Sequence, residues 1–378
     1  MVGVNTRGLA CSLKKLGFTV YSADYFGVID LKSCVARYKS VLSQKPYQSC
    51  GKFTETFNPD DVEKLAREFM DNSDFIICLA GVSPEHFREK KVMGNYMVGE
   101  VDDKYRLYQK LHNKFPFPAT FMISDIGEAV EIANNHPEKS FILKPRTGSG
   151  GYGIQELANM VEFDGVGEDF DLSGYFLQEK LAGQNLSASV LSTGTESQTI
   201  LTSQQIIGDM NLNQKQQFGY CRNITPYIGR EINNELMDIS EEIINQLSLI
   251  GSCGVDFILK KNELNVIEVN PRIQGTMECA ELSLNINMAE AHIKACQGTL
   301  MDIPYPERFA VKMIVHAPER SQTGNLNFLD VFDLPAANVI IEESEPVATV
   351  ITSGRILEDT IYSAHKTVKM VYNDLNPV

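Results

Sequence analysis

The sequence of 378 residues contains no tryptophan, no Cys-x-x-Cys pair and no long apolar run. No stretch approaches the roughly 18 consecutive apolar residues of a membrane-spanning helix, and no charged-then-apolar leader opens the chain. The eight cysteines are scattered, mostly among apolar neighbours, which is typical of buried free thiols in a reducing compartment. We therefore expect a cytoplasmic protein with no membrane partner.

Positive charge is also scarce. Lysine and arginine together number 34 against 49 aspartates and glutamates, which gives a net charge of −15 and a pI near 4.9. A protein that binds nucleic acid through its phosphates is normally basic, so we expect no nucleic-acid partner. A small anionic ligand needs only a local basic pocket and is not excluded.

The remaining composition, 43% hydrophobic and 22% charged residues, is that of a globular protein, and the length predicts two or three domains. In residues 1–100, strands expected at 1–4, 18–23 and 75–79 alternate with helices at 7–16 and 60–70. This alternation favours a parallel sheet.

Ligands of parallel sheets gather beyond the carboxyl ends of the strands. Asn5, Arg7, Asp24 and Gly81 occupy such positions. For each of them a turn or capping role is the alternative.

Beyond residue 100 the periodicity predicts both helices and strands. The expected helices are residues 101–111, 124–134, 232–249, 288–296 and 357–372. The expected strands are residues 141–144, 175–179, 186–190, 199–207, 311–316, 339–342 and 348–353. A polar acidic stretch extends to about Leu172, and residues 214–227 are expected to form an ordered loop.

Residues 254–272 read GVDFILKKNELNVIEVNPR, and their period of two predicts a β-hairpin. Its arms are residues 255–260 and 264–270, joined by a three-residue polar turn. We place Lys260 opposite Leu264, which sets the register of the two arms.

In that register Asp256 lies opposite Glu268, and Asn270 points from the same face. Two carboxylates at this distance repel and raise each other's pKa. A cation such as Mg²⁺, which takes oxygen ligands, removes that repulsion, and Arg272 adds a fixed positive charge nearby. The alternative is an exposed hairpin face with scattered polar residues.

A glycine-rich loop, KPRTGSGGYGI, begins at Lys144, and its Gly148, Gly150 and Gly153 match G-x-G-x-x-G. That pattern alone is weak. Lys144 stands at the end of a predicted strand, so its ammonium can reach phosphates that the backbone N–H groups of the loop cradle. The alternative is a flexible surface turn.

Residues 176–183, FLQEKLAG, follow as an apolar strand running into Gln178 and Glu179. A helical Asp-Lys pair at Lys104, the Lys144 loop, this hinge and an acidic hairpin ending in Asn-Pro-Arg occur in that order. The order resembles the ATP-grasp superfamily, which includes biotin carboxylase, D-alanine–D-alanine ligase and the large chain of carbamoyl-phosphate synthase. Within the superfamily the chain is most similar to small archaeal carboxylate–amine ligases.

The resemblance covers about residues 1–300 and implies an α/β and α+β architecture. Residues 1–100 would form a parallel α/β (pre-ATP-grasp) domain. Residues 101–300 would form the ATP-grasp domain, with a lid at about 118–178. Residues 301–378 would form a β-rich C-terminal segment.

The resemblance also implies roles for individual residues. ATP would be bound by Lys104, Lys144, Gly148, Gly150, Gly151, Gly153, Gln178, Glu179, Leu181 and Asn185. Magnesium or manganese would be held by Asp256, Glu268 and Asn270, while Arg272 and Lys144 would be catalytic. Family members usually carry an acid where this chain has Asn185, so the contact to the ribose departs from the family pattern.

The implied activity is that of an ATP-dependent ligase, which activates a carboxylate as an acyl phosphate and joins it to an amine. Its partners would be a small carboxylate and an amine, and a homodimer is one possible assembly. Activation of bicarbonate or another small acid is an alternative. A nucleotide-binding sensor or subunit without catalysis is a second alternative.

Overall fold

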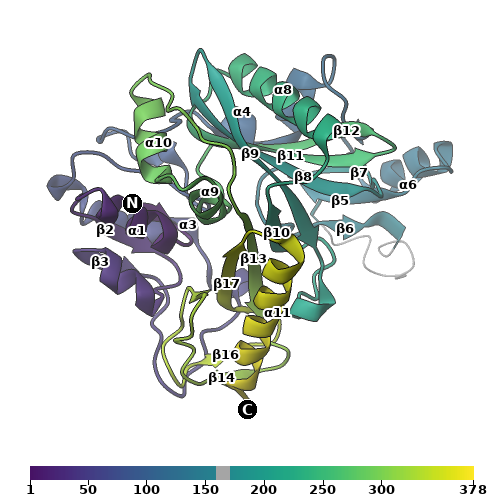
Figure 1. Ribbon diagram of the computed structural model, residues 1–378. Helices are drawn as coiled ribbons and strands as arrows, with labels where there is room; N and C mark the ends of the chain where they lie inside the picture. Colours follow the sequence, from purple (N-terminus) through teal and green to yellow (C-terminus); the bar gives the residue numbers. More distant parts are fainter. Residues whose placement is uncertain (159–170) are drawn as a thin grey trace.

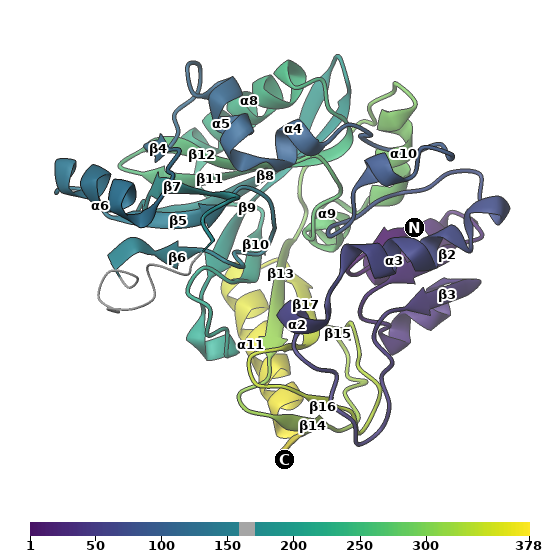
Figure 2. The same ribbon diagram turned by 180° about the vertical axis from the view of Figure 1, so that it is seen from behind.

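The computed structural model describes residues 1–158 and 171–378 (Figure 1). The acidic stretch predicted before Leu172 lies mostly outside these residues. Two views related by a half turn show an N-terminal α/β layer, a large twisted sheet, a smaller sheet beside it and a long C-terminal helix (Figure 2). The predicted combination of α/β and α+β architecture is confirmed.

The N-terminal layer is a parallel sheet, as predicted. Its strands are β1 (Val2–Gly3), β2 (Tyr21–Asp24) and β3 (Arg37–Ser40), in that order, and both pairs are parallel. The accompanying helices are α1 (Arg7–Lys15), α2 (Phe53–Thr56), α3 (Pro59–Arg67) and the 3₁₀ turns η1 (Ile29–Cys34), η2 (Met70–Asn72) and η3 (Pro84–His86). The strand expected at 75–79 is reduced to isolated parallel bridges from Ile76 and Cys78.

Local chemistry explains where these helices begin and end. The Asn58 side chain accepts a hydrogen bond from the Asp60 N–H, and Pro59 occupies the first turn of α3, where its missing N–H is no loss. Helix α1 ends before Gly17, whose φ of 84° lies in the left-handed region that favours glycine.

The large sheet has eight antiparallel strands. In spatial order they are β12 (Glu263–Asn270), β11 (Ile250–Lys260), β8 (Gln184–Thr193), β9 (Ser197–Ile207), β10 (Tyr220–Thr225), β13 (Phe309–His316), β17 (Pro346–Gly354) and β15 (Val331–Phe332). The helices of this region are α4 (Gly99–Asp102), α5 (Lys104–Leu111), α8 (Arg230–Gln246), α9 (Met277–Leu284) and α10 (Met288–Cys296), with η4 (Met210–Leu212) between β9 and β10.

Alternation along β8 separates two hydrophobic cores. Leu186, Ala188 and Val190 pack with apolar residues of α5 and α8. Leu191, which points the other way, packs with residues of α1 and α10. The sheet is therefore covered on both faces at this strand, and the N-terminal layer attaches to it through the second core.

A separate four-stranded sheet stands beside the hairpin end of the large sheet (Figure 2). Its strands are β4 (Thr120–Phe121), β7 (Tyr175–Glu179), β5 (Phe141–Pro145) and β6 (Gln155–Glu156), in that order, and α6 (Ile126–Asn135) accompanies them. The sheet has its own small core, which includes Phe141, Leu143 and Leu177. The four-stranded sheet is therefore a separately packed part of the structure that lies beside the hairpin strands β11 and β12.

The residues after 300 continue the large sheet, because β13 pairs with β10 on one side and with β17 on the other. Helix α11 (Leu357–Asn373) packs on β13 and β17. A three-stranded sheet of β16 (Ile340–Ile341), β14 (Ser321–Thr323) and β18 (Leu375–Pro377) closes this end. Among the described residues no helix has both the length and the apolar character needed to cross a membrane.

Two local expectations were wrong. The helix expected over 101–111 breaks at Asp103, because its carboxylate accepts hydrogen bonds from the N–H groups of Tyr105 and Arg106 and so caps a new helix, α5. The loop expected over 214–227 contains strand β10, which fills the gap between β9 and β13.

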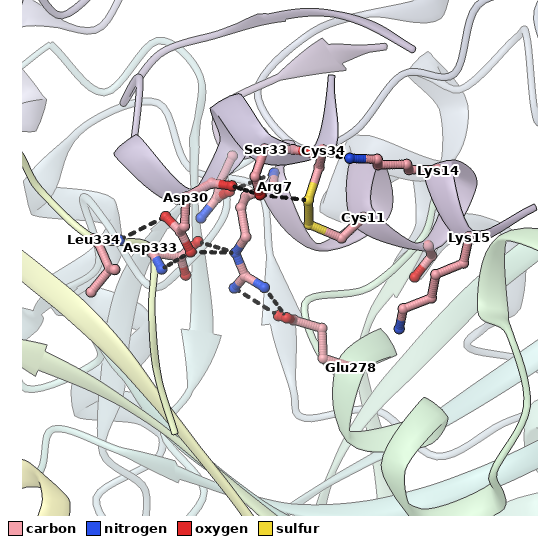
Figure 3. The surroundings of a disulfide bond; sticks show 12 residues. Arg7, Cys11, Lys14, Lys15, Asp30, Ser33, Cys34, Glu278, Asp333 and Leu334 are labelled. Atoms are coloured by element: carbon pink, nitrogen blue, oxygen red, sulfur yellow. Dashed lines mark hydrogen bonds and ion pairs between the residues drawn. A yellow bond between two sulfur atoms is a disulfide. The ribbon is translucent and has the colours of Figure 1, made fainter. Parts of the chain in front are cut away.

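The expectation that all eight cysteines are free thiols was also wrong. Cys11 on α1 and Cys34 at the end of η1 form a disulfide (Figure 3). The sequence separates these two residues by 23 positions, and only the packing of α1 against η1 brings them together. The other six cysteines are free, and four of them are buried.

Beside the disulfide, Arg7 joins the N-terminal layer to the rest of the protein (Figure 3). Its Nε lies 3.0 Å from Asp333 Oδ1 and 3.4 Å from Asp30 Oδ2, and its Nη2 lies 3.2 Å from Glu278 Oε2. Burial raises the pKa of Asp333, but the charge of Arg7 outweighs burial and holds that pKa well below its usual range. Arg7 therefore neutralises carboxylates from three separate segments.

We predict that Arg7→Met lowers the free energy of unfolding by about 3–5 kcal/mol, because buried carboxylates lose their counter-charge. The depressed pKa of Asp333 stabilises the fold above the ordinary carboxyl pKa, and this contribution is lost as the pH falls. The deficit of the variant should therefore be smaller in acid than at neutral pH. Guanidinium unfolding followed by circular dichroism measures both quantities.

Arg67→Met is the matched control, because Arg67 and its partner Glu89 are both about half exposed and such pairs contribute little. Equal losses in the two variants would contradict the role assigned to Arg7.

Candidate active site

The predicted hairpin exists, with one difference in register. Its turn has two residues, Lys261 and Asn262, both with positive φ, so Lys260 pairs with Glu263 instead of Leu264. A β-bulge after Asp256 then inserts one extra residue into β12. The bulge restores the predicted pairing, and Asp256 faces Glu268 directly.

The side chains of this pair and Asn270 occupy one small region. Asn270 Nδ2 lies 3.0 Å from Asp256 Oδ2 and 3.5 Å from Glu268 Oε1. Gln205 on β9 donates to Asp256 Oδ1 at 3.0 Å. Gln205 was not among the predicted residues, since a glutamine at an ordinary strand position carries no distinguishing pattern.

Three cations surround the carboxylate pair. Burial raises the pKa of Glu268, but the charges of Lys104, Lys144 and Arg272 outweigh it and lower that pKa below its usual range. For Asp256, burial and the negative charge of Glu268 both raise the pKa. The pKa values of the two acids are therefore shifted in opposite directions, and Glu268 is the one that stays ionised to lower pH.

The three cations come from different elements. Lys104, at the start of α5, lies 3.4 Å from Glu268 Oε2. Lys144 on β5 is 4% exposed, and burial lowers the pKa of its ammonium to about 8. Arg272 follows β12, and its Nη2 donates to Asn270 Oδ1 at 2.9 Å.

The glycine loop closes one side of this region. Lys104 Nζ donates to the Gly148 carbonyl at 2.7 Å, and the Tyr220 N–H donates to the Gly150 carbonyl at 3.3 Å. At Gly151, φ is 80°, and a Cβ there would lie 1.7 Å from the Phe218 carbonyl oxygen. The backbone of the loop is thus packed directly against the segment before β10, and no larger residue fits at Gly151.

The predicted hinge lies at the end of β7. Gln178 is buried, and its Oε1 accepts a hydrogen bond from Lys144 while its Nε2 donates to Thr120. Glu179 lies 3.1 Å from Lys139 and 3.2 Å from Lys260. Both side chains therefore have protein partners that sequence patterns did not indicate.

These groups line a cavity of about 460 Å³ between the small sheet and the hairpin. Of the residues predicted to bind ATP or metal or to be catalytic, only Gly153 is not part of its wall. The wall contains the predicted residues Lys104, Lys144, Gly148, Gly150, Gly151, Gln178, Glu179, Leu181, Asn185, Asp256, Glu268, Asn270 and Arg272. The described residues contain no cluster of three or more His, Cys, Asp or Glu side chains suited to a metal. The oxygen donors that the hairpin presents to the cavity are two carboxylates and the Asn270 amide.

The four residues predicted at strand ends of the N-terminal layer make different contacts in the structure. Asn5 borders a second cavity. Arg7 is used by the ion pairs described above, and Asp24 accepts hydrogen bonds from Ser40 and the Gly27 N–H. Gly81 lines a small recess of about 60 Å³.

A family model for the ATP-grasp domain matches residues 101–276. The uncharacterised protein MJ0776 of Methanocaldococcus jannaschii is 30% identical over 369 residues, which cover 94% of this chain and 88% of that protein. The chain belongs to the ATP-grasp family.

Two further comparisons, one of sequence and one of structure, give similarities to proteins of named activity. Tyramine–L-glutamate ligase of Methanocaldococcus jannaschii is 28% identical over 178 residues, 45% of this chain and 46% of that enzyme. The biotin carboxylase domain of Hydrogenobacter thermophilus 2-oxoglutarate carboxylase, solved with MgADP, ADP and bicarbonate, gives a TM-score of 0.72 at 15% identity. That match covers 99% of this chain and 89% of the other, and it establishes a shared fold. The chain is thus similar in sequence to a tyramine–L-glutamate ligase and similar in fold to a biotin carboxylase domain.

We predict that Gly151→Ala disrupts the contact between the glycine loop and the segment that leads into β10, because the added Cβ collides with the Phe218 carbonyl. Hydrogen exchange of the Tyr220 amide, which donates to Gly150, should accelerate by about tenfold or more, corresponding to a loss of roughly 1.4 kcal/mol.

Gly174→Ala is the matched control. Gly174 also has a positive φ, 95°, but a Cβ there meets nothing within 4 Å, so it incurs the backbone strain without the collision. An unchanged Tyr220 exchange rate in Gly151→Ala would contradict the packing described here.

Proposed function

We propose that this protein is an ATP-dependent ligase, which activates a carboxylate as an acyl phosphate and joins it to an amine. The observation that carries the proposal is the paired carboxylates Asp256 and Glu268, which lie beside Lys104 and Lys144 in the wall of one cavity of about 460 Å³. A site that only binds a nucleotide does not need this concentration of compensating charge. The relative that ligates tyramine to glutamate supports the same class of reaction.

The residues present fit a nucleotide with a divalent cation. Asp256, Glu268 and Asn270 offer the oxygen ligands that Mg²⁺ or Mn²⁺ prefers, and their side chains share one small region. When bound there, the cation would neutralise charge on the phosphates. Lys104 and Lys144 would contact the phosphates, and the N–H groups of the loop from Gly148 to Gly153 would cradle them.

The remaining nucleotide contacts are proposed for the hinge. Gln178 and Glu179 border the cavity where the adenine would lie, and Leu181 would offer its backbone. Asn185 can hydrogen-bond a ribose hydroxyl through its amide, although family members usually have an acid at that position.

The proposed reaction has two steps. A carboxylate oxygen bonds to the γ-phosphorus while the bond from that phosphorus to the bridging oxygen breaks, and ADP leaves. The amine nitrogen then bonds to the acyl carbon, the bond from that carbon to the phosphate oxygen breaks, and the nitrogen loses a proton as phosphate departs. Arg272, beside Asn270, stabilises the negative charge that develops, and the glycine loop excludes water from the acyl phosphate.

Activation of bicarbonate is the second candidate, favoured by the structural likeness to a carboxylase domain solved with bicarbonate. The two candidates differ in what the reaction requires. Phosphate release that depends on an amine and an organic acid supports the ligase, whereas release that depends on added bicarbonate supports the alternative.

We predict that Glu268→Gln lowers ATP turnover by about two orders of magnitude or more, because the site loses the carboxylate that the surrounding cations keep ionised and that would bind the metal. The fold should survive, since Gln has the same size and Glu268 contributes no core packing. Phosphate release with ATP, Mg²⁺ and a panel of amino acids and amines provides the assay, and circular dichroism checks the fold. EDTA should abolish the wild-type signal, and excess Mg²⁺ should restore it.

Glu263→Gln is the matched control on the same hairpin. Glu263 is exposed at the turn and remote from the cavity, so turnover should be unchanged. Wild-type turnover in Glu268→Gln would remove the metal assignment, and with it the proposed chemistry.

A further inference from the structure

A second cavity of about 330 Å³ adjoins the candidate active site. Ser149, Gly150, Tyr152, Tyr220 and Gly275 line both cavities, so the two spaces meet at the glycine loop and at the segment after β12. The volume is within the range of pockets that hold small organic ligands. A molecule in the second cavity therefore borders the first along the glycine loop and along Gly275, which follows Arg272 in the chain.

The second cavity is located at the carboxyl edge of the N-terminal parallel sheet. Asn5 follows β1, Tyr25 follows β2 and Leu42 follows β3, and all three border it. Residues of the C-terminal segment, including Lys312 and Glu345, form the opposite wall. In open parallel sheets this edge is where ligands bind, so the topology independently indicates a binding site.

Aromatic rings dominate one side of the second cavity. The Tyr25 and Phe53 rings lie 5.1 Å apart, and Phe53 and Tyr152 lie 5.6 Å apart. Phe26 adds a ring 5.0 Å from Tyr25. These edge-to-face and tilted contacts hold the rings in place, and Tyr152 brings the glycine loop into the aromatic wall. Such a wall suits a ligand with a flat apolar body.

The charges of the second cavity disfavour an anion. Among the described residues that line it, the one ammonium is that of Lys312, which already donates to the Gly275 carbonyl at 2.8 Å and pairs with Glu278 at 3.2 Å. Burial lowers the pKa of His316 to about 4, so this imidazole is neutral near pH 7. Two carboxylates, Asp333 and Glu345, also line the second cavity. A phosphate or a carboxylate would find no unpaired cation among the lining residues that the structure describes.

Glu345 is the carboxylate available to a cationic ligand. Asp333 is paired with Arg7. The Glu345 carboxylate accepts a hydrogen bond from the Phe53 N–H at 2.9 Å, and the charge of Lys52 acts on it, but it forms no ion pair among the described residues. An ammonium between Glu345 and the aromatic rings would gain both a counter-charge and cation–π attraction.

We propose that the second cavity binds the acceptor substrate of the ligase, and that this substrate is an amine with an aromatic body. The proposal rests on the function proposed above. The amine enters as an ammonium beside Glu345 and the rings and releases one proton to water. At the border shared with the first cavity its nitrogen then bonds to the acyl carbon of the acyl phosphate, the bond from that carbon to the phosphate oxygen breaks, and the nitrogen loses its second proton as phosphate departs.

The first test is binding to the full-length protein, measured by saturation-transfer NMR with 2-phenylethylamine as the probe. We expect saturable binding of the probe. 3-Phenylpropionate has a similar body with the opposite charge, and n-butylamine has the charge without the ring. Each should bind about tenfold more weakly or worse, a difference of roughly 1.4 kcal/mol. Equal binding of 3-phenylpropionate, or no binding of 2-phenylethylamine at millimolar concentration, would overturn the proposal.

Two variants with matched controls locate the binding. Glu345→Gln retains an oxygen for the Phe53 N–H but loses the charge, and it should weaken 2-phenylethylamine about tenfold. Glu343→Gln, two residues away, exposed and paired with Lys215, should not. Phe53→Leu should also weaken the probe, whereas Phe18→Leu, at an aromatic residue outside both cavities, should not. Unchanged affinity in both Glu345→Gln and Phe53→Leu contradicts the assigned site.

MgADP binding, measured by calorimetry on the same proteins, distinguishes failure of the acceptor assignment from failure of the proposed ligase function. Normal MgADP affinity in all four variants shows that they are folded. If the wild type binds MgADP but not the aromatic amine, the acceptor assignment fails and the proposed ligase stands. If the wild type does not bind MgADP, the proposed function fails, and the acceptor role of the second cavity fails with it.

Discussion

The structure around the candidate site depends on the repulsion between two carboxylates on adjacent strands. Asp256 and Glu268 face each other on β11 and β12, and such a pair is unfavourable unless positive charge lies close by. Lys104, Lys144 and Arg272 supply it from a helix start, a strand of the small sheet and the end of the hairpin. Because these cations belong to three elements, the carboxylate pair ties the small sheet and α5 to the large sheet. The cavity between them is a consequence of that arrangement.

The residues of this site could be predicted because their signals are local. Period-two alternation placed Asp256, Glu268 and Asn270 on one face of a hairpin, and an order of short motifs indicated the ATP-grasp fold. The pairing of Asp256 with Glu268 was predicted correctly for an incomplete reason. The turn is one residue shorter than expected, and a bulge in β12 compensates for it. Alternation shows which face a side chain occupies, but a bulge depends on the partner strand and leaves no local pattern.

Other features depend on contacts between distant segments, and the sequence did not indicate them. The disulfide between Cys11 and Cys34 follows from the packing of α1 on η1. Strand β10 forms because β9 and β13 both pair with its backbone, although its own residues are polar enough to suggest a loop. The second cavity uses the N-terminal sheet, the glycine loop and the C-terminal segment together. Of the residues that line it, Asn5 follows a predicted strand and Gly150 belongs to the predicted phosphate-binding loop, but neither pattern indicated a second cavity.

The hydrogen bond from Lys104 to the Gly148 carbonyl has a consequence for the order of events at the site. The same ammonium that holds the loop also lies 3.4 Å from Glu268, and it has only three protons to donate. A phosphate oxygen that approaches Lys104 competes with the carbonyl for one of them. Occupation of the site and detachment of the loop at Gly148 would therefore be linked equilibria, in which the lysine exchanges an internal acceptor for an external one.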